Sequence, residues 1–403
     1  MTLRADVLVV GAGPAGAAAA TALARAGRDV VVVDKARFPR DKICGDGLTA
    51  GALPLLEELG VEPAAIPSWH DIDDVVLAPP HGRPETFSFP RGRGTYAAAA
   101  RRVELDATVL DAARRAGTTV HEGCPLVSAT MDDDGVRAQI EGLGEVAARF
   151  VIGADGMWSP LRKSLGLAVP GYRGESHAFR QYLRGVTGPA RDRLWIWFEP
   201  DLLPGYAWSF PLADGTVNVG FGIHRGGAIT VRDMAGIWRS LLRRPRLTDA
   251  LGPDWEAEGP HRAWPIPARI DRILLTSGRA LFVGDAAAAS DPMSGEGIGQ
   301  ALDTGMGAAR AILAAGPHGA EAATAAYEEE VRTGLARDNR LAEVMLELLR
   351  RPWGAQLGVR AAGATPWTRR NFVRWMFEDY PRGVLATPHR WHRGVLTGPG
   401  SYR

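Results

Sequence analysis

The first thirty-four residues carry an apolar pattern that is interrupted once by glycines. Residues 6–10 form a short, almost wholly apolar run, typical of a strand buried on both faces of a parallel sheet. A glycine-rich turn, 11–16, and a helix-forming stretch, 14–26, come next, and a second apolar run, 30–33, ends in Asp34. The pattern predicts strand, glycine turn, helix, strand and acid, which is the order of a Rossmann βαβ unit.

Two later apolar runs also end in an aspartate beside a glycine. Residues 151–153 lead into Asp155-Gly156, and residues 280–283 lead into Gly284-Asp285. In open α/β sheets, ligands bind at the carboxyl ends of the strands. We therefore expect both aspartates to face a bound ligand.

Other parts of the chain show strand and helix patterns without glycine turns. Tyr206, Trp208 and Phe210 alternate with small residues, which places three aromatic rings on one face of a strand. Residues 194–198 are apolar on both faces, and residues 318–350 repeat apolar positions at helical spacing, which predicts one helix.

The composition excludes several classes of protein. The 403 residues carry a formal net charge of +1, which gives no electrostatic reason to bind nucleic acid. Two cysteines, Cys44 and Cys124, are too few for a disulfide framework, and no metal site is predicted. We find no secretory signal and no apolar run of about 18 residues, so we expect a cytoplasmic protein.

The glycine turn has the features that a dinucleotide requires. Gly11 allows a tight turn, Gly13 allows the backbone to approach a pyrophosphate, and Gly16 allows the helix to pack closely on the strand. The helix N-terminus offers free N–H groups to the phosphates. Asp34 is suited to accept hydrogen bonds from the ribose hydroxyls.

The later motifs identify the dinucleotide as FAD. No second glycine fingerprint follows a strand, which argues against a separate NADPH domain. Asp285 is expected to bond a ribityl hydroxyl. A helix that begins near Gly297 would direct its dipole at the flavin ring and stabilise negative charge there.

In this order the motifs resemble those of the p-hydroxybenzoate-hydroxylase-like flavoproteins. Three further segments are similar to the geranylgeranyl reductase family within that group: residues 38–48 with Cys-Gly-Asp-Gly, 204–211 with Tyr-Ala-Trp, and 292–298 with Gly-Glu-Gly-Ile. The resemblance implies saturation of isoprenoid double bonds by reduced flavin. The substrates it implies are geranylgeranyl groups, polyprenyl lipids or menaquinone tails.

The expected fold class is α/β, with three regions. Residues 1–75, 96–165 and 262–318 would form a discontinuous Rossmann-type FAD-binding domain. Residues 76–95 and 166–261 would form an antiparallel-sheet substrate domain, and residues 319–403 a C-terminal helical region and tail.

The candidate cofactor site combines the motifs with positions that the resemblance implies. It implies that Cys44 lies beside the isoalloxazine and that Arg102 contacts the flavin; a small buried cysteine and a surface arginine are the plain alternatives. The expected cofactor-binding residues are Gly11, Gly13, Ala15, Gly16, Asp34, Lys35, Lys42, Cys44, Gly45, Arg102, Asp155, Gly156, Gly284, Asp285, Pro292, Gly295, Gly297 and Ile298.

The implied reaction needs an acid as well as a hydride from flavin N5, because an isolated alkene has no carbonyl to stabilise developing charge. Cys44 and Tyr206 are the candidate proton donors, although ordinary pKa values of ~8.5 and ~10 make neither a strong acid. The aromatic face of Trp208 is a candidate to steady cation-like charge. NAD(P)H or a partner electron carrier would reduce the flavin.

Two other functions fit the same motifs. The first is an FAD-dependent monooxygenase or halogenase acting on an aromatic or natural-product substrate. The Gly-Glu-Gly-Ile turn, the Cys-Gly-Asp-Gly loop and the lack of a Trp-x-Trp-x-Ile-Pro stretch argue against it. The second is a binding protein that holds flavin without turnover.

The C-terminal tail has its own composition. Residues 360–403 carry eight arginines, with aromatic residues interleaved. Such segments lie in lipid interfaces, which predicts peripheral contact with a membrane. The alternative is a helix and loop packed against the substrate domain.

Overall fold

The computed structural model describes residues 2–227, 229–384, 387–391 and 396–403. In this part of the chain an eight-stranded sheet contains the N-terminal βαβ unit, with the strand order β17-β18-β11-β1-β2-β8 and with β10 and β9 continuing from β11. Neighbouring strands from β18 to β8 are parallel. The strands are β1 (Leu3–Val10), β2 (Val30–Asp34), β8 (Thr119–Glu122), β9 (Leu126–Met131), β10 (Val136–Ile140), β11 (Gly144–Gly153), β17 (Thr276–Ser277) and β18 (Ala280–Phe282).

Three helices cover this sheet. Helix α1 (Pro14–Arg25) packs against α7 (Ile298–Ala315) and α3 (Arg102–Arg115). The α1 contact surface is a run of fully buried alanines, Ala17–Ala20, whose small side chains let the helices approach closely. The buried residues of these helices and strands form the largest hydrophobic core of the described chain.

A seven-stranded sheet forms the second layer, in the order β16-β12-β15-β14-β13-β5-β6. All its neighbours are antiparallel except β13 and β5. Its strands are β5 (Asp74–Ala78), β6 (Glu85–Ser88), β12 (Ser176–Arg184), β13 (Leu194–Trp197), β14 (Ala207–Pro211), β15 (Val217–His224) and β16 (Glu256–Ile266). The division of the chain at residues 76–95 and 166–261 stays a prediction; the sheet itself spans β5, which begins at Asp74, to β16, which ends at Ile266.

The described chain also contains a small sheet and several short helices. The sheet consists of β3 (Gly47–Leu48), β7 (Ala98–Ala99) and β4 (His70–Asp71). The helices are α2 (Leu53–Glu58), α4 (Pro160–Ser164), α5 (Met234–Leu241) and α6 (Pro245–Leu251), with 3-10 turns at Pro63–Ala65, Pro189–Arg191, Gly284–Ala287 and Pro388–Arg390. The predicted α/β fold class with a second antiparallel sheet and C-terminal helices is confirmed.

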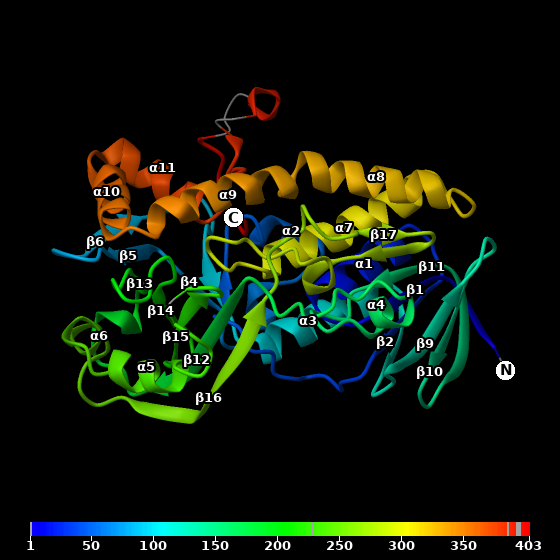
Figure 1. The fold of residues 1–403 in the computed structure, drawn as a ribbon, viewed down its shortest axis with the longest axis horizontal. Coiled ribbons are helices and arrows are strands. Elements are labelled where there is room, and N and C mark those ends of the chain that lie inside the picture. Colours follow the sequence, from blue (N-terminus) through cyan, green and yellow to red (C-terminus); the bar gives the residue numbers. More distant parts are fainter. Residues whose placement is uncertain (1, 228, 385–386, 392–395) are drawn as a thin grey trace.

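The C-terminal helices differ from the prediction at one point. Residues 318–350 form two helices, α8 (Ala320–Thr333) and α9 (Leu335–Leu349), because the chain leaves helical geometry at Gly334. Figure 1 shows α8 and α9 following each other along one side of the molecule toward β5 and β6. Helices α10 (Pro352–Gly363) and α11 (Pro366–Met376) then pack on β6. None of the described helices is long and apolar enough to cross a membrane.

Candidate functional site

A cavity of about 730 Å³ lies between the two large sheets. Its lining includes the carboxyl ends of β1, β2, β11 and β18 on one side and residues of β12, β14, β15 and β16 on the other. This size is in the range of ligand and cofactor sites, about 300–1,000 Å³. The cavity is therefore large enough for a cofactor and part of a substrate.

The cavity brings together all but one of the residues that the sequence nominated. Gly16 is the exception, because it lies behind the wall where α1 meets β1. The nominated residues on the lining are Gly11, Gly13, Ala15, Asp34, Lys35, Lys42, Cys44, Gly45, Arg102, Asp155, Gly156, Tyr206, Trp208, Gly284, Asp285, Pro292, Gly295, Gly297 and Ile298.

The glycine turn after β1 tolerates no side chain at its tightest points. Gly11 has φ +105°, and a Cβ there would lie 2.2 Å from the carbonyl oxygen of Ala154 on β11's continuation. A Cβ at Gly16 would lie 1.9 Å from the carbonyl oxygen of Gly11. The backbone of the turn thus forms the floor of the cavity, with the α1 N-terminus directed into it.

Asp34 fixes the turn from the end of β2. One carboxylate oxygen accepts the N–H of Ala12 at 2.7 Å, and the other accepts the N–H of Ala36 at 2.7 Å. Both acceptors therefore orient the backbone that surrounds the dinucleotide site. The carboxylate lies on the cavity lining, where a ribose would meet it.

The other two strand-end aspartates have different environments. Asp285 pairs with Lys42 at 3.4 Å, and the Lys42 ammonium lies 4.2 Å from the ring centre of Trp264. Asp155 accepts the N–H of Leu161 at the start of α4, while its other oxygen is buried without a partner among the described residues. Burial raises the pKa of Asp155.

These features fit FAD. Gly13 and Gly297 are the N-caps of α1 and α7. The first-turn N–H groups of α1 are available to phosphate, whereas Glu296 accepts the N–H of Gly299 in the first turn of α7. Both N-termini border the cavity. The unpartnered Asp155 oxygen supplies an acceptor beside them.

The strand of aromatic residues has the orientation that its alternation predicts. Tyr206, Trp208 and Phe210 line the cavity, whereas Ala207 belongs to the core on the other side of the sheet. The indole N–H of Trp208 donates to Asn218 at 3.2 Å. The Tyr206 hydroxyl donates to the carbonyl oxygen of Ser294 in the turn before α7.

Arg102 is a buried residue and not a surface arginine. Its side chain is 8% exposed and binds the fully buried Asp106 through Nε at 2.6 Å and through Nη2 at 2.8 Å. It also reaches the cavity wall beside Cys44, and its charge lowers the pKa of that thiol. Burial has the larger effect and raises the pKa of Cys44 above its ordinary value.

Asp46, the acid of the Cys-Gly-Asp-Gly segment, is buried behind the cavity lining. Its carboxylate accepts the hydroxyl of Tyr182 at 2.5 Å and the amide of Asn218 at 2.9 Å. Asn218 also donates to the carbonyl oxygen of Cys44 at 2.9 Å, which fixes the loop that presents the thiol. Burial raises the pKa of Asp46 to about 6. The only sign of this role in the sequence is a charged residue within the otherwise uncharged Cys-Gly-Asp-Gly segment.

Comparison with known proteins agrees with this geometry. Residues 4–191 match the family described as FAD binding domain. Menaquinone reductase of Mycolicibacterium smegmatis is 36% identical over 346 residues, 78% of each chain. Digeranylgeranylglycerophospholipid reductase of Methanothrix thermoacetophila is 29% identical over 349 residues, 83% of this chain and 85% of the relative.

Solved structures share the fold. A geranylgeranyl bacteriochlorophyll reductase-like protein from Thermoplasma acidophilum superposes with a TM-score of 0.79 at 21% identity, covering 97% of this chain and 100% of that one. A flavin-dependent halogenase superposes with a TM-score of 0.71 at 24% identity, over 94% of this chain and 68% of that one. The fold is thus common to reductases and halogenases, and the sequence relatives discriminate between them. The chain binds FAD and belongs to the geranylgeranyl reductase family of FAD-dependent oxidoreductases.

Proposed function

We propose that this enzyme reduces carbon–carbon double bonds of a prenyl chain. The observation that carries the proposal is the aromatic wall of Tyr206, Trp208 and Phe210, which extends the flavin cavity with apolar surface from the second sheet. Relatives named for menaquinone and for digeranylgeranylglycerophospholipid support a substrate with an isoprenoid chain. The head group that carries the chain is left open.

The protein's own residues would bind and orient the reactants. When bound, FAD in its reduced form supplies a hydride. The glycine turn, Asp34 and the two helix N-termini would hold the cofactor, while Lys42 and Arg102 border the site with positive charge. The aromatic wall would hold the prenyl chain and exclude water, so that positive charge developing on the alkene faces aromatic rings.

The pKa values bear on the two proton donors that the sequence nominated. Burial raises the pKa of the Cys44 thiol and of the Tyr206 hydroxyl, so both become weaker acids than in water. The Tyr206 proton is also engaged with the carbonyl oxygen of Ser294. We therefore assign Cys44 and Tyr206 to cavity lining and positioning in this proposal.

The electrons would come from outside the chain, through transiently bound NAD(P)H or a partner electron carrier. The lack of a second dinucleotide fingerprint supports an external donor. Anaerobic mixing with NADPH and NADH, followed at the flavin absorbance, tests the first route. Bleaching within seconds supports it, and bleaching only with dithionite supports a carrier protein.

The function is tested with reduced holoenzyme under anaerobic conditions. Geranylgeranyl and menaquinone substrates are added, and products are analysed by mass spectrometry. A gain of two hydrogens together with flavin reoxidation is expected. No anaerobic product, with an oxygen-dependent gain of one oxygen atom instead, would overturn the proposal in favour of a monooxygenase.

We also propose peripheral membrane contact through α10 and α11, because a prenyl lipid substrate resides in a membrane. Trp353 and Leu357 are one turn apart on α10 and are 62% and 55% exposed, and Trp367 at the start of α11 is 59% exposed. Arg360 and Arg370 are exposed on the same two helices. Aromatic side chains with flanking arginines favour a lipid interface.

Liposome co-sedimentation tests this contact. The triple variant Trp353→Ser, Leu357→Ser, Trp367→Ser should lose binding to anionic vesicles at least tenfold. The matched control is Val127→Ser, which removes an exposed apolar side chain on β9, far from these helices in Figure 1. Equal binding of both variants and the parent protein would contradict the proposal.

A further inference from the structure

The proposed reduction leaves the alkene's proton without a donor, and the cavity lining contains few acids. Five carboxyl side chains line it. Asp34 and Asp155 accept backbone N–H groups of the glycine turn and of α4. Asp41 and Asp285 each pair with a basic side chain. Glu296 has no ion-pair partner among the described residues.

Glu296 lies on the cavity lining, directly before α7. It precedes the N-cap of α7, and its Oε1 accepts the N–H of Gly299 at 2.8 Å. It is partly exposed to the cavity, and its charge raises the pKa of Cys44 and of Tyr206, so it lies near both. Burial raises the pKa of Glu296 to about 7, against the hydrogen bonds from the backbone N–H groups of Gly299 and Ile298 and the charge of Arg102, which lower it.

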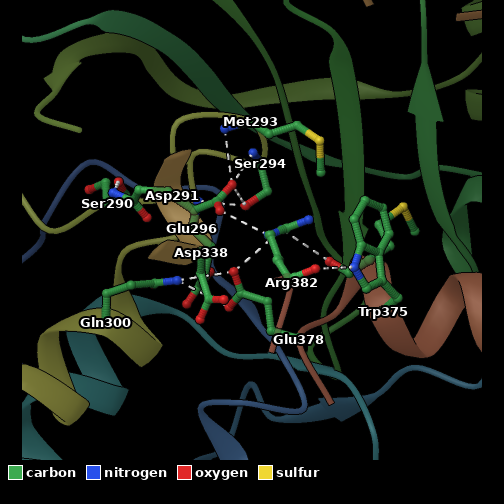
Figure 2. Close-up of polar contacts among 12 residues, drawn as sticks. Ser290, Asp291, Met293, Ser294, Glu296, Gln300, Asp338, Trp375, Glu378 and Arg382 are labelled. Carbon is green, nitrogen blue, oxygen red and sulfur yellow. Dashed lines mark hydrogen bonds and ion pairs between the residues drawn. The ribbon is translucent and has the colours of Figure 1, made fainter. Parts of the chain in front are cut away.

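Behind Glu296 lies a group of buried charges, which Figure 2 shows. Arg382 is 2% exposed and pairs with Asp291 at 2.9 Å and with Glu378 at 3.3 Å. Asp338 borders the same group and pairs with Arg390. The carboxyl groups of Asp291, Glu378 and Asp338 thus lie around the Arg382 guanidinium, and the charge of Glu296 acts on Glu378. Like charges in a buried site disfavour joint ionisation, so these neighbours favour a proton on one of the carboxyl groups.

Gln300 holds the Glu378 carboxylate in place. Its Nε2 lies 3.1 Å from both carboxylate oxygens of Glu378, while its own Oε1 is buried with no partner among the described residues. Burial raises the pKa of Glu378; Arg382 lowers it, and Asp291 and Glu296 raise it further.

We propose that Glu296 is the general acid of the double-bond reduction and that Glu378 is a positioning residue that keeps Glu296 protonated. The inference rests on the proposed function. The Glu296 O–H bond breaks as its proton adds to one alkene carbon, and a hydride from the two-electron-reduced flavin adds to the other. The alkene is reduced, the flavin is oxidised, and Glu296 is left as a carboxylate. Glu378, whose side chain is 16% exposed, provides the route for reprotonation from solvent.

Glu296→Gln tests the assignment, because glutamine can still accept the Gly299 N–H but cannot donate a carboxyl proton. The rate at which a prenyl substrate reoxidises the reduced holoenzyme should fall about 10²-fold or more, the usual contribution of a general acid. In the parent enzyme this rate should decline as pH rises through about 7, since the acid must be protonated. The decline should be absent from the variant.

A second readout does not depend on turnover. Infrared difference spectra of the oxidised holoenzyme between pH 6 and pH 8 should show the carbonyl band of a protonated carboxyl group. The band should disappear in Glu296→Gln and titrate at lower pH in Glu378→Gln, where one negative charge is lost. Glu329→Gln, on exposed α8, is the matched control and should behave as the parent enzyme.

The outcomes separate the inference from the function. If the parent enzyme reduces the prenyl chain and Glu296→Gln keeps both its rate and its pH profile, the general-acid assignment is wrong and the function stands. If Glu296→Gln loses FAD, the infrared titration of Glu378→Gln decides. A carbonyl band that titrates at the same pH as in the parent enzyme overturns the coupling between Glu378 and Glu296, and a band that titrates at lower pH supports it. If the parent enzyme reduces no prenyl chain, both proposals fail.

Discussion

Single residues explain why part of the site was predictable. Gly11, Asp34 and Asp285 belong to motifs whose geometry is contained within a few consecutive residues, so sequence alone nominated them. Asp46 depends on partners 136 and 172 residues away in the chain, and no local pattern indicates them. Its positive φ of 66°, rare for a residue with a side chain, is likewise a property of the folded loop.

The glycine turn gives the first prediction at this scale. Gly11→Ala should lower FAD affinity more than tenfold, about 1.4 kcal/mol, because its Cβ would lie 2.2 Å from the Ala154 carbonyl oxygen and displace the turn. Flavin-to-protein absorbance after purification, and FAD titration of the apoprotein, measure the loss.

Gly27→Ala is the control for backbone strain. Gly27 has φ +76° after α1, yet no atom lies within 4 Å of its would-be Cβ. We expect this variant to lose about 1–2 kcal/mol of stability from the left-handed conformation and to retain its FAD. Equal FAD loss in both variants would show that strain, and not the clash at the cavity floor, governs binding.

At the scale of elements, periodicity predicted the helices better than their ends. Apolar spacing continues through residues 318–350, but helical geometry stops at Gly334, where glycine allows a change of direction. The aromatic tail was open to two interpretations because composition does not say which rings are covered. In the structure Phe377 is buried against β5 and β6, whereas Trp367 is exposed.

The attachment of α11 to the second sheet gives the next prediction. Phe377 is 6% exposed, and its ring meets Phe89 edge-on at 5.2 Å. Phe377→Ala should therefore lower the free energy of unfolding by about 3–5 kcal/mol, the usual loss for a buried phenylalanine. Denaturant unfolding measures it. Trp367→Ala, a larger truncation at an exposed position, should cost less than about 1 kcal/mol, and a similar cost for both would refute this account of the packing.

At the scale of the whole molecule, the C-terminal region completes the site. The segments that carry the family resemblance end at residue 298, yet Glu378 and Arg382 lie beside Asp291 in the turn before α7. Motifs specify the cofactor side because each has a local chemical task. The group of buried charges behind Glu296 could not be predicted, because it forms where three segments that are far apart in the sequence meet.

This meeting of buried acids makes the stability of the whole protein depend on pH. Burial raises the pKa of Glu296 to about 7 and raises that of Glu378, so above pH 6.5 the folded state binds more protons than the unfolded chain. Buried histidines have the opposite effect at lower pH, because burial lowers the pKa of His177 to about 4 and also lowers that of His224. Their contribution fades over about one pH unit above the ordinary histidine pKa of about 6.5.

Between pH 6.5 and pH 8 the buried acids should therefore dominate. Stability should fall across this window by about 1 kcal/mol from Glu296 alone, with a further loss from Glu378. Denaturant unfolding at constant excess FAD, at three pH values in this window, measures the slope. Glu296→Gln removes the contribution of Glu296 and should make the free energy of unfolding depend less on pH. Glu329→Gln, on the exposed face of α8, should leave that dependence unchanged. A parent protein whose stability rises with pH here would show that the acids behind α7 are already ionised at neutral pH.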